Sequence, residues 1–150
     1  MTITAFELAQ RFIGVTETPG VASTPLVLAM LQLDNKWPQG DDVPWCSAFA
    51  NFIAWLLRLP RSKQLGARSW LMVGQSIPLE QAEPGFDVVI LKRGKDPQPG
   101  ADVTDAPGHV GWFAGREGDR VWVLGGNQGD RVSVEAFPVT SVLGIRRLSA

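Results

Sequence analysis

Residues 43–59, VPWCSAFANFIAWLLRL, contain the most apolar segment of this 150-residue chain. From Cys46 to Leu57, apolar side chains recur on most sides of a helical turn, a pattern typical of a helix that is buried over most of its surface. Pro60 ends the segment, because proline cannot continue a helix. We therefore expect a long buried helix that begins at Cys46.

The spacing of apolar residues differs between the sequence before this helix and the sequence after it. Upstream, Thr4 and Glu7 form a candidate capping box for a first helix, Gly14 ends it, and Pro25 begins a second helix. Downstream, short runs rich in Val, Ile, Phe and Trp alternate with turns that contain Gly and Asp, as antiparallel strands do. The expected strands are residues 86–92, 109–114, 120–124, 131–136 and 142–148. Helices packed on a C-terminal antiparallel sheet of about five strands predict a single α+β domain over residues 1–150.

The composition argues against several classes of protein. With 45% hydrophobic and 19% charged residues the chain is globular, and its net charge of −1 offers no basic field for nucleic acid or an anionic membrane. No apolar run has the length that a bilayer requires, and the N-terminal sequence lacks the features of a signal peptide. One cysteine and one histidine do not supply a four-ligand zinc site, and no glycine-rich nucleotide motif occurs. We expect no metal, no cofactor, no nucleic acid and no membrane insertion.

Cys46 is the first candidate for chemistry, since it begins the long apolar helix. Unpaired backbone N–H groups and the positive end of the helix dipole stabilise a thiolate at that position, and the thiolate is the nucleophilic form. The alternative is a buried structural cysteine that serves as a small hydrophobic side chain.

His109 is the only side chain that can act as a base near neutral pH without a large pKa shift. It begins an expected strand, and a helix N-terminus packed on a sheet can place a thiol beside such a strand. A third group should accept the other N–H of the imidazole. Asn127, Gln128 and Asp130 follow the neighbouring strand, and we expect Asn127 to take this role through its side-chain carbonyl.

Four segments carry a resemblance to a known family: VPWCSAFANFIAWLLRL (43–59), ARSWL (67–71), GHVGWFAG (108–115) and VLGGNQGDRVSVEAF (123–137). They resemble the papain-like cell-wall hydrolases of the NlpC-type superfamily, near its CHAP branch (cysteine, histidine-dependent amidohydrolase/peptidase), which occur in bacteria and phages. The resemblance implies a papain-like α+β fold, with Cys46 as nucleophile and His109 as base. CHAP relatives usually carry Glu-x-Asn where this chain has Gly125-Gly126-Asn127, so Asn127 alone matches the third position.

Five further residues are candidates for contacts with the substrate. Trp45, Trp70 and Trp112 lie beside the motifs and are candidates to line a groove for a muropeptide, with Trp45 the best placed; the alternative is that they fill the core. Arg68 and Asp42 are candidates to bind carboxylate or amine groups of a stem peptide, and solvated surface charge is the alternative.

The resemblance implies a cysteine peptidase or amidase that cleaves an amide bond of peptidoglycan, of the N-acetylmuramoyl-L-alanine amidase or D,L-endopeptidase type. We expect a phage endolysin, made in the cytoplasm without a signal peptide and acting on the wall after release. An amidase effector injected into a competing cell, with an immunity protein as partner, is the first alternative. The others are a non-catalytic wall- or peptide-binding module on the same fold, and an acyltransferase or deamidase with the same site.

Overall fold

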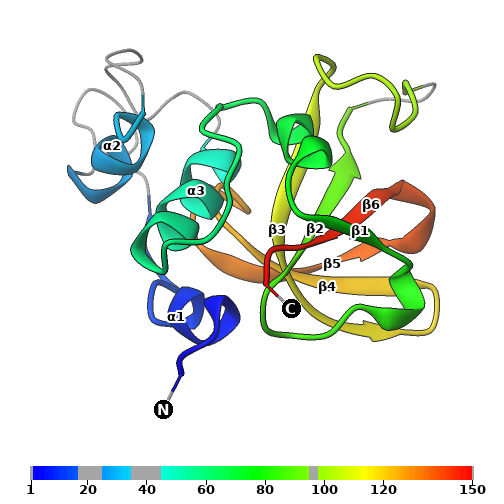
Figure 1. Cartoon of the computed structure of the whole chain (residues 1–150), viewed down its shortest axis with the longest axis horizontal. Helices are drawn as coiled ribbons and strands as arrows, with labels where there is room; N and C mark the ends of the chain where they lie inside the picture. The colour runs from blue at the N-terminus through cyan, green and yellow to red at the C-terminus, as the bar shows by residue number, and fades with distance from the viewer. Residues whose placement is uncertain (1, 17–24, 35–44, 95–97, 150) are drawn as a thin grey trace.

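The computed structural model describes residues 2–16, 25–34, 45–94 and 98–149 (Figure 1). The helices are α1 (Ala5–Gln10), α2 (Pro25–Leu31) and α3 (Cys46–Leu56), with short 3₁₀ helices η1 (Ala67–Met72), η2 (Leu79–Gln81) and η3 (Val139–Ser141). The strands are β1 (Gln75–Ile77), β2 (Asp87–Lys92), β3 (Gly108–Glu117), β4 (Arg120–Gly125), β5 (Ser133–Pro138) and β6 (Val142–Arg147).

The first two helices begin where local sequence signals place them. Thr4 Oγ1 accepts the N–H of Glu7 at 3.1 Å, and the Glu7 carboxylate accepts the N–H of Thr4 at 2.7 Å, which confirms the capping box. α1 ends at Gln10, before Gly14, which adopts a φ of +97° in the following turn. Pro25 is the first residue of α2.

α3 is the buried helix that the apolar segment predicts, and its whole first turn lies in the core. It ends in a Schellman motif: the N–H of Leu59 donates to the carbonyl of Ala54 at 2.9 Å, and the N–H of Arg58 to that of Trp55 at 3.1 Å. Arg58 has a φ of +57° at the position where glycine is the usual residue. This hydrogen-bonded end stops the helix before the proline at position 60 is reached.

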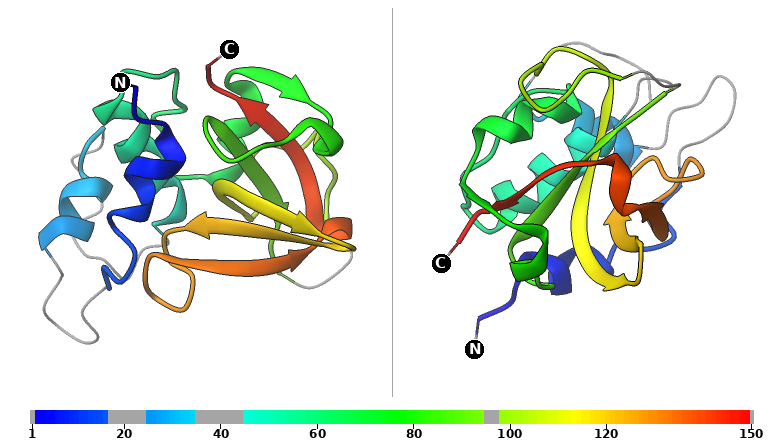
Figure 2. Two further views of the ribbon diagram at one scale, coloured as in Figure 1. Left: turned by 90° about the horizontal axis from the view of Figure 1, so that it is seen from below. Right: turned by 90° about the vertical axis from the view of Figure 1, so that its right-hand side faces the viewer.

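The strands form one antiparallel sheet in the order β1-β6-β2-β3-β4-β5. Figures 1 and 2 show α1, α2 and α3 gathered on one side of a curved sheet. β2 lies centrally and is buried on both faces, so that Val88 and Ile90 contact the helices while Val89 and Leu91 face the other way. A second apolar cluster lies on the face of the sheet that Val89 and Leu91 occupy, and apolar side chains of η2 and η3 pack against it.

Five of these strands fall on the segments that the sequence predicts, with boundaries that differ by a few residues. A tight turn at Gly118 and Asp119 joins β3 to β4 in an antiparallel hairpin. β1 is not predicted, because its three residues are too few to show a period; it exists through its pairing with β6. In the described part of the chain, no helix has the length and apolarity needed to cross a membrane.

Candidate functional site

Cys46 and His109 meet where the N-terminus of α3 packs against the start of β3, and their side chains are hydrogen-bonded. Cys46 is the first residue of α3, and His109 is the second residue of β3. The backbone N–H of Val110 donates a further hydrogen bond to the Cys46 sulfur. The fold therefore brings together a thiol and an imidazole that lie far apart in the sequence, as their positions at a helix start and a strand start predict.

The two groups favour each other's charged forms. Burial raises the pKa of the Cys46 thiol, but the hydrogen bond and charge of His109 outweigh that effect and bring the pKa below the ordinary thiol value. Burial lowers the pKa of His109, but the hydrogen bond and charge of Cys46, with the hydrogen bond of Gln128, raise it above its ordinary value. Both shifts favour a thiolate–imidazolium pair, which is the reactive state of a cysteine nucleophile.

Gln128 holds the second nitrogen of the imidazole. Its Oε1 lies 2.8 Å from His109 Nε2. Its own Nε2 donates to the carbonyls of Val123 at 3.1 Å and Ser133 at 2.9 Å, so both amide hydrogens are used and the oxygen is directed at the imidazole. His109 Nε2 therefore carries a proton, and Nδ1 is the nitrogen left for the thiol.

The orienting contact expected of Asn127 is thus made by its neighbour. Asn127 has a φ of +58° in the connection between β4 and β5, a left-handed conformation that asparagine tolerates. The chain turns there, so that Gln128 is buried against His109 while Asn127 is partly exposed. Both residues line the cavity beside the imidazole.

Two glycines before this turn allow the close approach. A Cβ at Gly125 would lie 2.6 Å from Gln128 Oε1 and 3.4 Å from His109 Nε2. A Cβ at Gly126 would lie 2.8 Å from two ring carbons of Trp45. The Gly-Gly-Asn-Gln run thus needs its glycines because neither position has room for a Cβ.

Backbone N–H groups at the start of α3 are available for a negatively charged oxygen. The first hydrogen bond of the helix runs from the N–H of Phe49 to the carbonyl of Trp45 at 3.0 Å. The N–H groups of residues 46–48 precede this bond, and the side chain of Trp45 does not cap the helix. These donors lie at the end of α3 that carries Cys46 and can stabilise an oxyanion formed beside the sulfur.

Two small cavities flank the pair. One, the thiol pocket, has a volume of about 360 Å³; its lining residues are Cys46, Leu65, Gly66, Ala67, Arg93, Asp105, Ala106, Pro107 and Gly108. The other, the imidazole pocket, has a volume of about 340 Å³; its lining residues are Lys92, Arg93, His109, Asn127, Gln128, Gly129, Glu135, Ala136 and Phe137. The sulfur, although nearly buried, therefore borders an open cavity.

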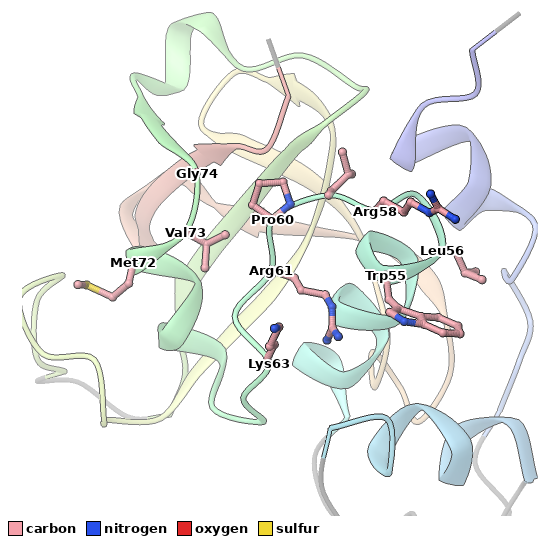
Figure 3. Close-up of a pocket in the computed structure, with 10 residues that line it drawn as sticks. Trp55, Leu56, Arg58, Pro60, Arg61, Lys63, Met72, Val73 and Gly74 are labelled. Carbon is pink, nitrogen blue, oxygen red and sulfur yellow. The ribbon is translucent and has the colours of Figure 1, made fainter.

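A larger cavity of about 890 Å³ lies at the other end of α3, between its last residues and the end of η1 (Figure 3). Trp55, Met72 and three cationic residues, Arg58, Arg61 and Lys63, are among the residues that line it. The residues described in its lining include no thiol, imidazole or carboxylate, which are the groups that acyl transfer needs. We therefore place the candidate active site at the smaller pockets.

The three tryptophans considered for a groove lie in the core. Trp45, Trp70 and Trp112 are fully buried in the layer between the helices and the sheet. Trp70 Nε1 donates to Ser47 Oγ at 2.9 Å, which ties η1 to α3. The groove interpretation is wrong for all three and the core interpretation is confirmed, because the layer between helix and sheet is where large rings bury most area.

Arg68 is also buried, which contradicts the expectation of a substrate-binding residue. Its Nε donates to the carbonyl of Pro107 at 2.9 Å, and its Nη1 to those of Gly100 at 2.8 Å and Val103 at 3.1 Å. It therefore holds the connection between β2 and β3, which forms one wall of the thiol pocket. Asp42 lies outside the described residues. Nowhere in the described ranges do three or more His, Cys, Asp or Glu side chains gather as a metal site would require.

The fold is similar to two solved structures from Trichomonas vaginalis, NlpC1 and NlpC2. The TM-scores are 0.55 and 0.56, each at 18% sequence identity. The matches cover 96% of this chain but 42% and 44% of the two proteins, so the chain spans less than half of either. No family model matches the sequence, and no curated protein matches it. The similarity shows an α+β, papain-like fold of the NlpC type.

Proposed function

We propose that this protein is a peptidoglycan hydrolase that cleaves an amide bond of the stem peptide by cysteine catalysis. The observation that carries the proposal is the hydrogen-bonded series Cys46–His109–Gln128, placed at a helix N-terminus beside an open pocket. A binding module has no need of a thiolate–imidazolium pair, which costs burial of two charges. The NlpC-type fold supports the choice of substrate.

The geometry supports acylation of the thiol in the first half of the reaction. The Cys46 thiolate attacks the amide carbonyl, an S–C bond forms, and the oxygen becomes an oxyanion that accepts hydrogen bonds from the N–H groups of residues 46–48. When the C–N bond breaks, His109 Nδ1 gives its proton to the leaving amine. A thioester and a neutral imidazole remain.

Hydrolysis of the thioester restores the site. Neutral His109 takes a proton from water as the oxygen attacks the thioester carbonyl, and collapse of the intermediate expels the Cys46 thiolate and frees the carboxylic acid. Throughout both halves, Gln128 keeps the proton on Nε2 and so directs Nδ1 toward the reacting atoms.

Digestion of purified peptidoglycan tests the proposal. The wild type should release fragments with new amine and carboxyl termini, each cleavage adding the mass of one water, whereas transfer to another acceptor adds no water. Cys46→Ala should release none while it retains the thermal unfolding of the wild type. Equal release by the two proteins would refute nucleophilic catalysis by Cys46. The termini found by mass spectrometry also distinguish an amidase from an endopeptidase.

Phage lysis is the biological setting that we propose, on the strength of the sequence resemblance to phage and bacterial wall hydrolases. An injected effector with the same chemistry is the alternative. A neighbouring gene whose product binds this protein and blocks wall hydrolysis would establish an effector with its immunity protein. A neighbouring gene for a hole-forming membrane protein would establish the endolysin.

A further inference from the structure

Arg93 is a cation at the active site that the proposed chemistry does not use. It directly follows β2, whose last two residues, Leu91 and Lys92, pair with His109 and Gly108 of β3. Its side chain therefore lies beside the start of β3, where it lines the same pocket as the imidazole. Arg93 is exposed, and it makes none of the hydrogen bonds or ion pairs found among the described residues.

Arg93 is the residue that the thiol pocket and the imidazole pocket have in common. The first pocket contains the nucleophile and the second contains the base. A substrate whose carbonyl reaches the sulfur of Cys46, and whose chain continues past His109, must therefore pass the guanidinium. Within the described ranges, no other residue lines both pockets.

The other charges of the two pockets lie on different elements. Lys92 adds a second cation at the end of β2, whereas the carboxylates belong to Asp105, before β3, and Glu135, on β5. The charge of Arg93 reaches the reacting groups, because it lowers the pKa of both Cys46 and His109. The junction of the two pockets therefore presents a cation that no described residue pairs with, in the pocket that the sulfur also lines.

We propose that Arg93 binds a carboxylate of the substrate close to the scissile amide, and that the enzyme selects peptides with a free acidic group there. A guanidinium fits this role because its planar N–H groups match the two oxygens of a carboxylate. The inference rests on the proposed function and specifies its substrate class. Arg93 then has the role that was predicted from the sequence for Arg68, whose guanidinium donates to loop carbonyls instead.

Alkylation of Cys46 tests the anion site without any hydrolysis. Iodoacetate and iodoacetamide have the same leaving group and nearly the same size, but iodoacetate carries a carboxylate. The ratio of their rates is insensitive to the thiolate fraction, which enters both rates equally. Arg93→Gln should lower the iodoacetate/iodoacetamide ratio by roughly three- to tenfold, since a cation that lines the same pocket as the sulfur is lost, and Arg93→Lys should retain most of it.

Arg116→Gln is the matched control, because it removes the same charge near the far end of β3 from His109. It should leave the alkylation ratio at the wild-type value. An unchanged ratio in Arg93→Gln, or an equal fall in Arg116→Gln, would overturn the proposal.

Hydrolysis provides the second test. For stem peptides that differ only in a free or an amidated carboxylate beside the scissile bond, Arg93→Gln should lower kcat/KM for the free acid by roughly ten- to a hundredfold and affect the amide little. Equal losses for both peptides would refute carboxylate recognition. If the wild type cleaves neither peptide, the proposed function fails, and the alkylation ratio still decides the role of Arg93.

Discussion

Gln128 Oε1 lies 2.8 Å from His109 Nε2, and both amide hydrogens of Gln128 are held by backbone carbonyls. A neutral amide orients the imidazole without neutralising its positive charge. The charge therefore remains available to stabilise the Cys46 thiolate, which a carboxylate in the same place would partly offset.

Replacing Gln128 tests this relationship through the pH dependence of activity. The hydrogen bond of Gln128 raises the pKa of His109, so Gln128→Ala should lower it. The imidazolium is present below that pKa and is lost as the pH rises through it, so the alkaline limb of kcat/KM should move to lower pH. Gln128→Glu should move it to higher pH, because a carboxylate favours the cation.

Asn127→Ala is the control for this series, as Asn127 lines the same pocket. Its alkaline limb should coincide with that of the wild type. A shift in Asn127→Ala without one in Gln128→Ala would return the orienting role to Asn127.

Local signals predicted much of the fold and two residues of the site, Cys46 and His109. Cys46 begins an apolar run and His109 begins a strand, and both features are visible within a few residues of sequence. Asn127 and Gln128 could not be told apart, because the choice depends on the left-handed turn at Asn127, which directs the longer side chain inward. The strand β1 forms by pairing with β6, some seventy residues away, and no local sequence pattern predicts it.

The burial of Arg68 and of the three tryptophans could not be predicted from the sequence, for another reason. Proximity to a motif along the chain does not say which face of an element a side chain occupies. Arg68 lies in a 3₁₀ helix, too short for a periodic pattern to separate an inner from an outer face. Its contacts are with carbonyls more than thirty residues away.

Arg68→Met should destabilise the protein, since it keeps the length of the side chain but removes the donors to three carbonyls. We expect a loss of roughly 2–4 kcal/mol in the free energy of unfolding, as for other buried hydrogen-bond networks. Urea denaturation followed by tryptophan fluorescence measures it. A change below about 0.5 kcal/mol, the level of an ordinary surface substitution, would mean that Arg68 does not hold the loop.

Gly126→Ala should also destabilise, because its new Cβ would lie 2.8 Å from ring carbons of the fully buried Trp45. Overpacking of this kind costs roughly 1–3 kcal/mol. Gly85→Ala is the matched control, because a Cβ there meets nothing within 4 Å. Thermal unfolding of both variants decides the point, and equal melting temperatures would show that the turn does not press on Trp45.

Arg58→Gly should stabilise the protein. Arg58 is exposed and holds a φ of +57° at the Schellman end of α3, a conformation that glycine adopts without the steric cost of a Cβ. The expected gain is about 1 kcal/mol, or roughly 2–4 °C in Tm for a domain of this size. A lower Tm would indicate that α3 does not end in the left-handed conformation.

The pH dependence of Cys46 alkylation by iodoacetamide tests the thiolate–imidazolium pair most directly, because the rate follows the thiolate population. In the wild type, the midpoint should lie below the ordinary pKa of a cysteine thiol. In His109→Gln it should move upward, since burial then acts on the pKa of the thiol without the opposing charge. A wild-type midpoint at or above the ordinary value, unchanged in His109→Gln, would contradict the pairing on which the proposed catalysis depends.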